Sequence, residues 1–132
     1  MQELISAYLH TDYRVFEPAL SIRIGEANEA LDELLRSHHC LEWAYLTAWN
    51  PMSVPTGEAE NREQNRRLRE ELAGYPLFEG EGVGADPGWE PEQSFLVLGI
   101  PRAAAIETGR KYRQLAIVCG MAGSPAELLL LE

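Results

Sequence analysis

Stretches in which every second residue is apolar alternate along this chain with stretches in which apolar residues recur at every third or fourth position. The first pattern is typical of half-buried strands and the second of amphipathic helices. Tyr13 and Val15 alternate with polar residues, and so do the apolar residues of 20–24, whereas those of 27–38 share one helical face. Because the two patterns need different backbones, the chain is expected to combine a sheet with helices.

The order of these patterns predicts the fold class. Further strands are expected at 43–49, 95–98, 116–119 and 126–131, the last two as a hairpin, and helices at 2–10, 27–38, 58–73 and 103–111. Helices and strands alternate in the middle of the chain, while hairpin-like pairs occupy both ends. The sequence therefore predicts one domain over residues 1–132, of the α/β or α+β class, with a mixed sheet of about five to six strands and three to four helices packed on it.

The segment 80–88 is expected to be a loop. It contains four glycines and one proline, which disfavour regular structure. Its glycines are followed by Pro87 instead of opening a helix, so a dinucleotide-binding loop is not expected. The chain also has no Walker, GxSxG or HExxH motif. We therefore expect no cofactor and no metal site.

Charge and composition exclude some partners. The formal net charge of −10 opposes binding to nucleic acids and to anionic membranes, because both need clustered Lys and Arg. No apolar run is long enough to span a bilayer and the N-terminus does not resemble a secretory signal, so a cytoplasmic location is expected. Cys40 and Cys119 are not a CxxC pair and are expected to be reduced thiols.

Four arginines of the predicted helix 58–73 are the exception to the acidic composition. They alternate with glutamates at helical spacing, which predicts a solvated surface of salt bridges. An anion-binding face is the alternative. The residues concerned are Arg62, Arg66, Arg67 and Arg69, with Glu63, Glu70 and Glu71.

The buried face of the same helix is expected to turn polar towards its N-terminus. Leu68 and Leu72 define the apolar stripe, and helical steps backward from them reach Asn65, Asn61 and then Glu58. This end of the helix follows the loop that leaves the predicted strand 43–49. Strand ends and helix N-termini are common ligand-binding positions in such proteins.

We therefore predict one polar pocket at this position. An alternative is purely structural, in which the amides and the serine bond turn and loop backbone instead of a ligand. The residues expected to line the pocket are Thr47, Trp49, Asn50, Ser53, Asn61 and Asn65.

A carboxylate-rich loop, 84–94, is predicted to complete the pocket. Asp86 and Glu92 are the candidate catalytic acid or base, and Trp89 is the aromatic of this loop. An ordinary Asp-Pro-Gly turn is the alternative. Arg110 follows Ala103 and Ile106 on one helical stripe, which would turn it towards the sheet to pair with a carboxylate such as Glu92, and it is kept as a candidate site residue on that ground; the favoured interpretation is a cation near a helix C-terminus. Gln114 is interpreted as a surface amide.

Several motifs follow one another along the chain: Thr47-Ala48-Trp49-Asn50-Pro51 with Ser53, Glu60-Asn61 with Asn65, Gly82, Gly84, Asp86-Pro87, Trp89, Glu92, Ser94 and 96–99. Together they resemble the bacterial domain-of-unknown-function family 3293. The likeness begins at 8–13 and extends to the last strand. The resemblance implies no activity, cofactor or partner, but it implies that the polar positions found from helical phase belong to a recurring pattern.

Two functions stay open at this point, and the sequence does not decide whether the protein is an enzyme. The first is binding of a small polar ligand in the predicted pocket. The second is a non-catalytic protein–protein interaction or regulatory module, for which Trp89 and Tyr75 in loops would anchor a protein partner.

Overall fold

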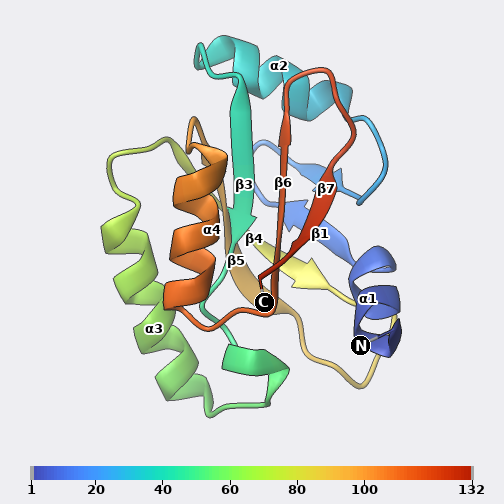
Figure 1. Ribbon diagram of the computed structural model, residues 1–132, viewed down its shortest axis with the longest axis vertical. Coiled ribbons are helices and arrows are strands. Elements are labelled where there is room, and N and C mark those ends of the chain that lie inside the picture. Colours follow the sequence, from blue (N-terminus) through green and yellow to red (C-terminus); the bar gives the residue numbers. More distant parts are fainter. Residues whose placement is uncertain (1, 132) are drawn as a thin grey trace.

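The computed structural model describes residues 2–131, which form a seven-stranded sheet with four α-helices and one 3₁₀ turn (Figure 1). Every strand pairing in the sheet is antiparallel, in the order β2-β1-β4-β5-β3-β6-β7. The strands are β1 (Asp12–Val15), β2 (Leu20–Ile22), β3 (Glu42–Leu46), β4 (Leu77–Val83), β5 (Glu92–Leu98), β6 (Ala116–Met121) and β7 (Glu127–Leu130).

The helices divide between the two faces of the sheet. They are α1 (Gln2–Leu9), α2 (Glu29–Ser37), α3 (Glu58–Glu71) and α4 (Arg102–Lys111), with the 3₁₀ turn η1 at Pro51–Ser53. Figure 1 shows α3 and α4 on one side of the strands, α2 across one end and α1 near the other. The start of α2 is fixed by Asn28, whose side chain accepts a hydrogen bond from the Leu31 N–H.

The sheet is curled, and its two faces carry separate cores. A parallel bridge joins Ile24, just beyond β2, to Ala126, just before β7, so the two edges of the sheet meet at the α2 end. The convex face packs under α3 and α4 through residues such as Leu68 and Ala105. The concave face packs under α2 with the residues Tyr13, Val15, Trp43, Tyr45, Leu96, Leu98 and Val118. Because α2 fills only one end of it, the concave face needs other cover at the opposite end.

The expectation of a mixed sheet with about five to six strands was wrong on both counts. The helical crossovers do relate parallel strands, as β3–α3–β4 and β5–α4–β6, but a third strand lies between the two members of each pair. That intervening strand is antiparallel to both neighbours. The mixture of helices and a sheet was confirmed, in the α+β form.

The additional strand is β4, whose second half was expected to be a loop. A Cβ atom at Gly80 would lie 1.8 Å from the Arg14 carbonyl oxygen and 2.9 Å from the Tyr45 hydroxyl oxygen. Only glycine fits at that position, because β4 must pass over both groups to pair with β1. The glycine content that disfavoured a strand is thus required by its neighbours.

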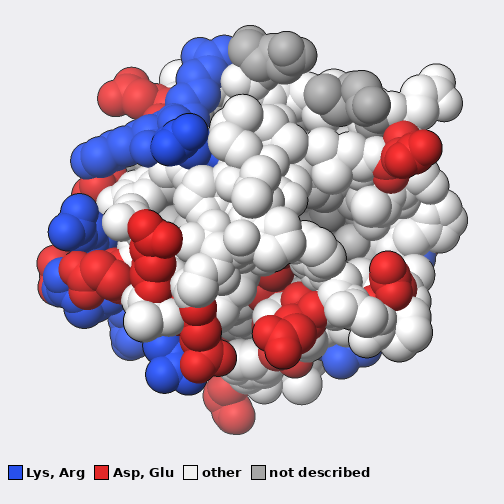
Figure 2. Space-filling model, turned by 90° about the horizontal axis from the view of Figure 1, so that it is seen from below, with Lys and Arg blue, Asp and Glu red and all other residues white. Residues whose placement is uncertain are grey.

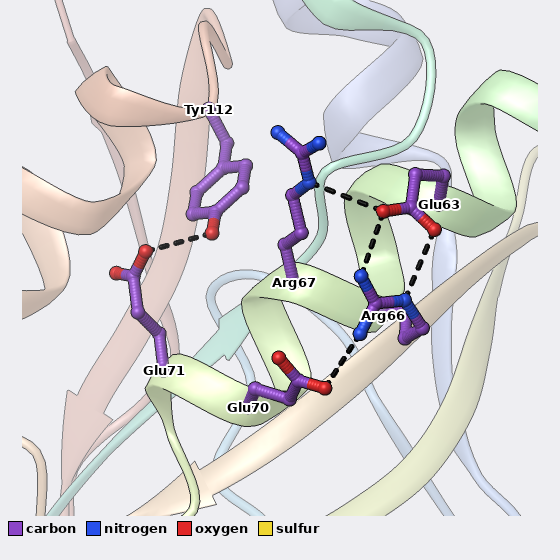
Figure 3. Close-up of polar contacts among 6 residues, drawn as sticks. All are labelled: Glu63, Arg66, Arg67, Glu70, Glu71 and Tyr112. Atoms are coloured by element: carbon purple, nitrogen blue, oxygen red, sulfur yellow. Dashed lines mark hydrogen bonds and ion pairs between the residues drawn. The ribbon is translucent and has the colours of Figure 1, made fainter.

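The exposed face of α3 is a surface of ion pairs, as predicted (Figure 3). Arg66 bonds both Glu63 and Glu70, and Arg67 bonds Glu63. Hydrogen bonds from Arg66 and Arg67 lower the pKa of Glu63 to about 2. Arg62 and Arg69 pair with Glu58 and Glu79. These arginines are matched by carboxylates, which argues against the alternative of an anion site.

Two further expectations concern the cysteines and the membrane. Cys40 and Cys119 are both free thiols. Within residues 2–131, the longest apolar helical stretch falls short of what a bilayer crossing requires.

Candidate functional site

A pocket of about 600 Å³ occupies the end of the concave face that α2 leaves open. Its floor is formed by concave-face residues of the strands, including Tyr45, Val118 and Leu128, and one wall is α1. The remaining walls are the loop 47–53 and the segment 82–92. Figure 2 looks onto this end of the molecule and shows the hollow in the surface.

Glu92 is the half-buried carboxylate of this pocket. Its Oε2 accepts hydrogen bonds from the Trp89 indole Nε1 at 2.9 Å and from the Asn50 side-chain Nδ2 at 3.2 Å. Burial raises the pKa of Glu92 and outweighs these two bonds, which act in the opposite direction. Glu92 is thus held in place by neutral donors that do not cancel its charge.

Asn50 links this carboxylate to α3. Its backbone is left-handed, with φ of 45°, and Met52 and Ser53 also have positive φ values. Asn61 supports this loop by accepting a hydrogen bond from the Asn50 N–H at 2.9 Å and by donating to the Asn50 side-chain oxygen at 2.8 Å. Asn50 also accepts a bond from the Thr56 N–H. A strained loop that is fixed by buried amides is typical of a functional site.

Asn65, one turn further along α3, also holds neighbouring backbone in place with its side-chain amide. Its side-chain oxygen accepts a hydrogen bond from the Ala48 N–H at 2.7 Å, and its amide donates to the Gln93 carbonyl at 2.8 Å. Thr47 donates to that same carbonyl. Asn61 and Asn65 are 1% and 2% exposed, as the helical phase predicts. Glu58, which the same helical steps placed on this face, is exposed, so that part of the prediction was wrong. Asn65 ties the end of β3 to the start of β5.

The structure places the ten sequence-predicted site residues in two groups. The pocket is lined by Thr47, Asn50, Ser53, Asp86, Trp89 and Glu92. The other four, Trp49, Asn61, Asn65 and Arg110, do not line it. Asn61 and Asn65 instead satisfy backbone and loop groups, as the structural alternative proposed, so they act behind the pocket wall.

Arg110 does not face the sheet, so of its two interpretations the structure agrees with the favoured one, a cation near the helix C-terminus. The buried positions of α4 are Ala105 and Gly109, so the stripe drawn through Arg110 was out of phase. Arg110 is exposed and has no ion pair within residues 2–131. It lies in the last turn of α4, where a cation is favoured by the helix dipole.

Sequence reasoning missed the tyrosines and the glutamine of the pocket. Tyr8, Tyr13 and Tyr45 line it, and the Tyr8 hydroxyl lies 3.5 Å from Ser53 Oγ. Gln114 also lines it and donates to the Trp49 carbonyl, so it is not a simple surface amide. Tyr8 and Tyr13 lie in the segment 8–13, where the sequence analysis placed the start of the resemblance, so that segment had already been singled out.

The chemistry of the lining is acidic and aromatic. Among residues 2–131, no Lys or Arg lines the pocket, whereas Glu3, Asp86 and Glu92 do. The described residues also contain no group of three or more His, Cys, Asp or Glu side chains that could hold a metal ion.

Comparison with known proteins identifies the family. The model of the family described as "Protein of unknown function (DUF3293)" matches residues 46–117, more than half of the chain. The chain belongs to this family. No curated protein and no solved structure shows significant similarity to it. The matched region holds the Asn50 loop, α3 and Glu92, but α1 lies outside it.

Proposed function

We propose that this protein binds a small organic molecule in the pocket at the open end of the curled sheet. The observation that supports this most directly is a cavity of ligand size that contains a half-buried carboxylate, Glu92. Ligand pockets are commonly of about 300–1,000 Å³, with apolar walls and a few placed polar groups. The polar groups that line this pocket include Glu92, Asn50, Ser53 and Thr47.

The first helix supports the same proposal. None of the side chains of residues 2–9 is fully buried, although Leu4 and Tyr8 of α1 point to a shared, half-buried face. Leu4, Ala7 and Tyr8 line the pocket instead of a packed core. A bound molecule would bury this apolar face further, and α1 would gain contacts that it otherwise lacks.

If the ligand reacts, Glu92 is the better of the two candidate acids or bases. Its raised pKa brings it nearer to neutral pH, as proton transfer requires. Asp86 is exposed, and its side chain accepts a hydrogen bond from the Gly88 N–H at 2.8 Å, as in the ordinary turn that was the alternative for this segment.

The interaction module has less support. Its predicted anchors were Trp89 and Tyr75. Trp89 is 39% exposed but lines the pocket and bonds Glu92, while Tyr75 is half-buried against the convex-face core. Neither residue lies open on a flat apolar patch, so we favour the small ligand.

The test is a thermal-shift screen of metabolites on three proteins. Gly82→Val adds a side chain at the pocket wall, where a Cβ would meet Thr11 and Tyr13 at 3.8 and 3.9 Å. Gly74→Val is the control, since a Cβ there has nothing within 4 Å. At about 100 times its dissociation constant, a ligand stabilises the folded state by about 2.7 kcal/mol.

We expect at least one compound to raise the melting temperature of the wild type and of Gly74→Val but not of Gly82→Val. Equal stabilisation of Gly82→Val, or no stabilising compound in a broad library, would contradict the proposal.

A further inference from the structure

The charge and the aromatic lining of the pocket define the chemical class of its ligand. We infer that the ligand is an organic cation, a protonated amine or guanidine attached to an apolar, planar body. This inference rests on the proposed function, because it concerns the occupant of the same pocket.

The first support is the unoccupied half of the Glu92 carboxylate. Both hydrogen bonds that Glu92 receives, from Trp89 and Asn50, end on Oε2. Its Oε1 accepts no hydrogen bond from any residue in 2–131, and the carboxylate forms no salt bridge within that range. Because the structure holds no buried side-chain oxygen without a partner among the described residues, this oxygen is accessible and is free to accept a hydrogen bond from a ligand N–H.

The second support is the lack of competing cations at the lining. Within the described residues, no Lys or Arg reaches the pocket surface. The nearby Arg14 and Arg23 are engaged by Asp12, at 3.5 and 2.7 Å. Figure 2 shows acidic side chains near the hollow, while most basic ones gather on the α3 side of this face. The field at Glu92 therefore favours a positive group and disfavours an anion.

His10 is the one lining residue of the described chain that could itself become a cation. Its Nδ1 lies 2.8 Å from the carbonyl oxygen of Ser6 in α1, and within residues 2–131 it forms no hydrogen bond or ion pair with Glu92. The carboxylate thus has no internal counter-charge in this region.

The third support is the way in which the tyrosines are held. The hydroxyl of Tyr13 donates to the Tyr8 carbonyl and that of Tyr45 donates to the Arg14 carbonyl. The Trp89 indole N–H is likewise taken by Glu92. Because the hydroxyls of Tyr13 and Tyr45 and the indole N–H of Trp89 are occupied, these three residues offer a ligand mainly ring surface. Ring surface stacks on planar bodies and attracts cations.

The experiment compares ligands that share a skeleton and differ in charge. One set is 2-phenylethylamine, 2-phenylethanol and phenylacetate; the other is tryptamine, tryptophol and indole-3-acetate. Each is titrated at neutral pH into the wild type, into Glu92→Gln, which keeps the shape but removes the charge, and into Glu42→Gln. Glu42 is a half-buried glutamate at the far end of β3 and does not line the pocket.

We expect an amine to raise the melting temperature of the wild type and of Glu42→Gln by about 3 °C or more at saturating concentration. Its alcohol and acid are expected to bind at least about 10-fold more weakly, and Glu92→Gln to weaken the amine by about 10- to 100-fold, as for loss of a charged hydrogen bond.

Two results would overturn the inference. If an alcohol or an acid binds as tightly as its amine, and Gly82→Val blocks it, the ligand is not a cation but the pocket is still a binding site. If neither amine binds, or if the amines bind Glu92→Gln as well as the wild type, the assignment of the cation to Glu92 fails. Whether the pocket binds any small molecule is then decided separately by the metabolite screen.

Discussion

Replacement of Asn65 by alanine tests the link between α3 and the pocket wall. Asn65→Ala removes two buried hydrogen bonds, to the Ala48 N–H and to the Gln93 carbonyl. The Gln93 carbonyl keeps the bond from Thr47, but the Ala48 N–H has no replacement partner, and Ala48 is fully buried. The structure therefore predicts one orphaned backbone donor.

The expected loss of stability follows from that count. An unsatisfied buried polar group costs about 1–3 kcal/mol, and the space left by the amide adds about 1 kcal/mol. Asn65→Ala should thus lose about 2–4 kcal/mol of unfolding free energy, out of the 5–15 kcal/mol that is usual for a domain. Gln64→Ala, the preceding residue on the same helix, should change it by less than about 0.5 kcal/mol.

Asn65→Asp distinguishes the contribution of the hydrogen bond that the side chain accepts from that of the bond it donates. The aspartate still accepts from the Ala48 N–H, but its second oxygen faces the Gln93 carbonyl and has a proton to donate only at low pH. Its stability, relative to the wild type, should therefore improve on acidification. Urea denaturation monitored by circular dichroism measures all three variants. If Asn65→Ala were as stable as Gln64→Ala, the account of the buried amide would be refuted.

Three other predictions follow from local geometry. Gly80→Ala should lower the unfolding free energy by more than about 3 kcal/mol, because the added Cβ would overlap the Arg14 carbonyl oxygen. Gly82→Ala should leave the unfolding free energy almost unchanged, since its Cβ would make only ordinary contacts. Urea denaturation measures both variants. The pKa of Glu92 is raised in the folded state, so protonation of Glu92 stabilises the fold. This stabilisation is fully present below the usual pKa of 4.5 and is lost as the pH rises through the raised pKa of the folded state. In Glu92→Gln, the unfolding free energy should no longer show this fall with rising pH. Carbon NMR of the side-chain carboxyls should find Glu63 titrating near pH 2, and a value near 4.5 would mean that its bonds to the arginines do not persist in solution.

Helical phase is the part of the site that the sequence predicts best. Spacing along α3 depends only on the geometry of the helix, so Leu68 and Leu72 suffice to indicate that Asn61 and Asn65 point inward. The hydrogen-bond partners of these amides, in contrast, come from other parts of the chain and cannot be read from the spacing along α3. The sequence left two possibilities open, ligand contact and loop support, and the coordinates place both amides behind the wall.

Strand β4 shows where sequence reasoning fails. Composition treats each glycine as a sign of irregular structure, whereas Gly80 is a glycine because Arg14 and the Tyr45 hydroxyl occupy the space of its side chain. Those residues are far apart in the sequence. No local pattern contains that information, so both the strand count and the antiparallel order were missed.

The contribution of α1 was missed for a related reason. Its apolar face is short and, within residues 2–9, contains no fully buried side chain, so it gives a weak helical signal. Its importance arises from its position: the Tyr8 hydroxyl lies 3.5 Å from Oγ of Ser53, 45 residues further along the chain, and both residues line the pocket. Only the curled sheet brings these segments together.

The most direct test of the central claim, that the pocket takes up a small molecule, is an NMR titration that follows the indole N–H signals. Trp89 donates its N–H to Glu92 at the pocket wall, whereas Trp43 is buried near Gly120 in the concave-face core, outside the lining. A compound that stabilises the protein should shift the Trp89 indole signal and leave that of Trp43 in place. Stabilising compounds that shift neither signal, or that act on residues away from the pocket, would contradict the account.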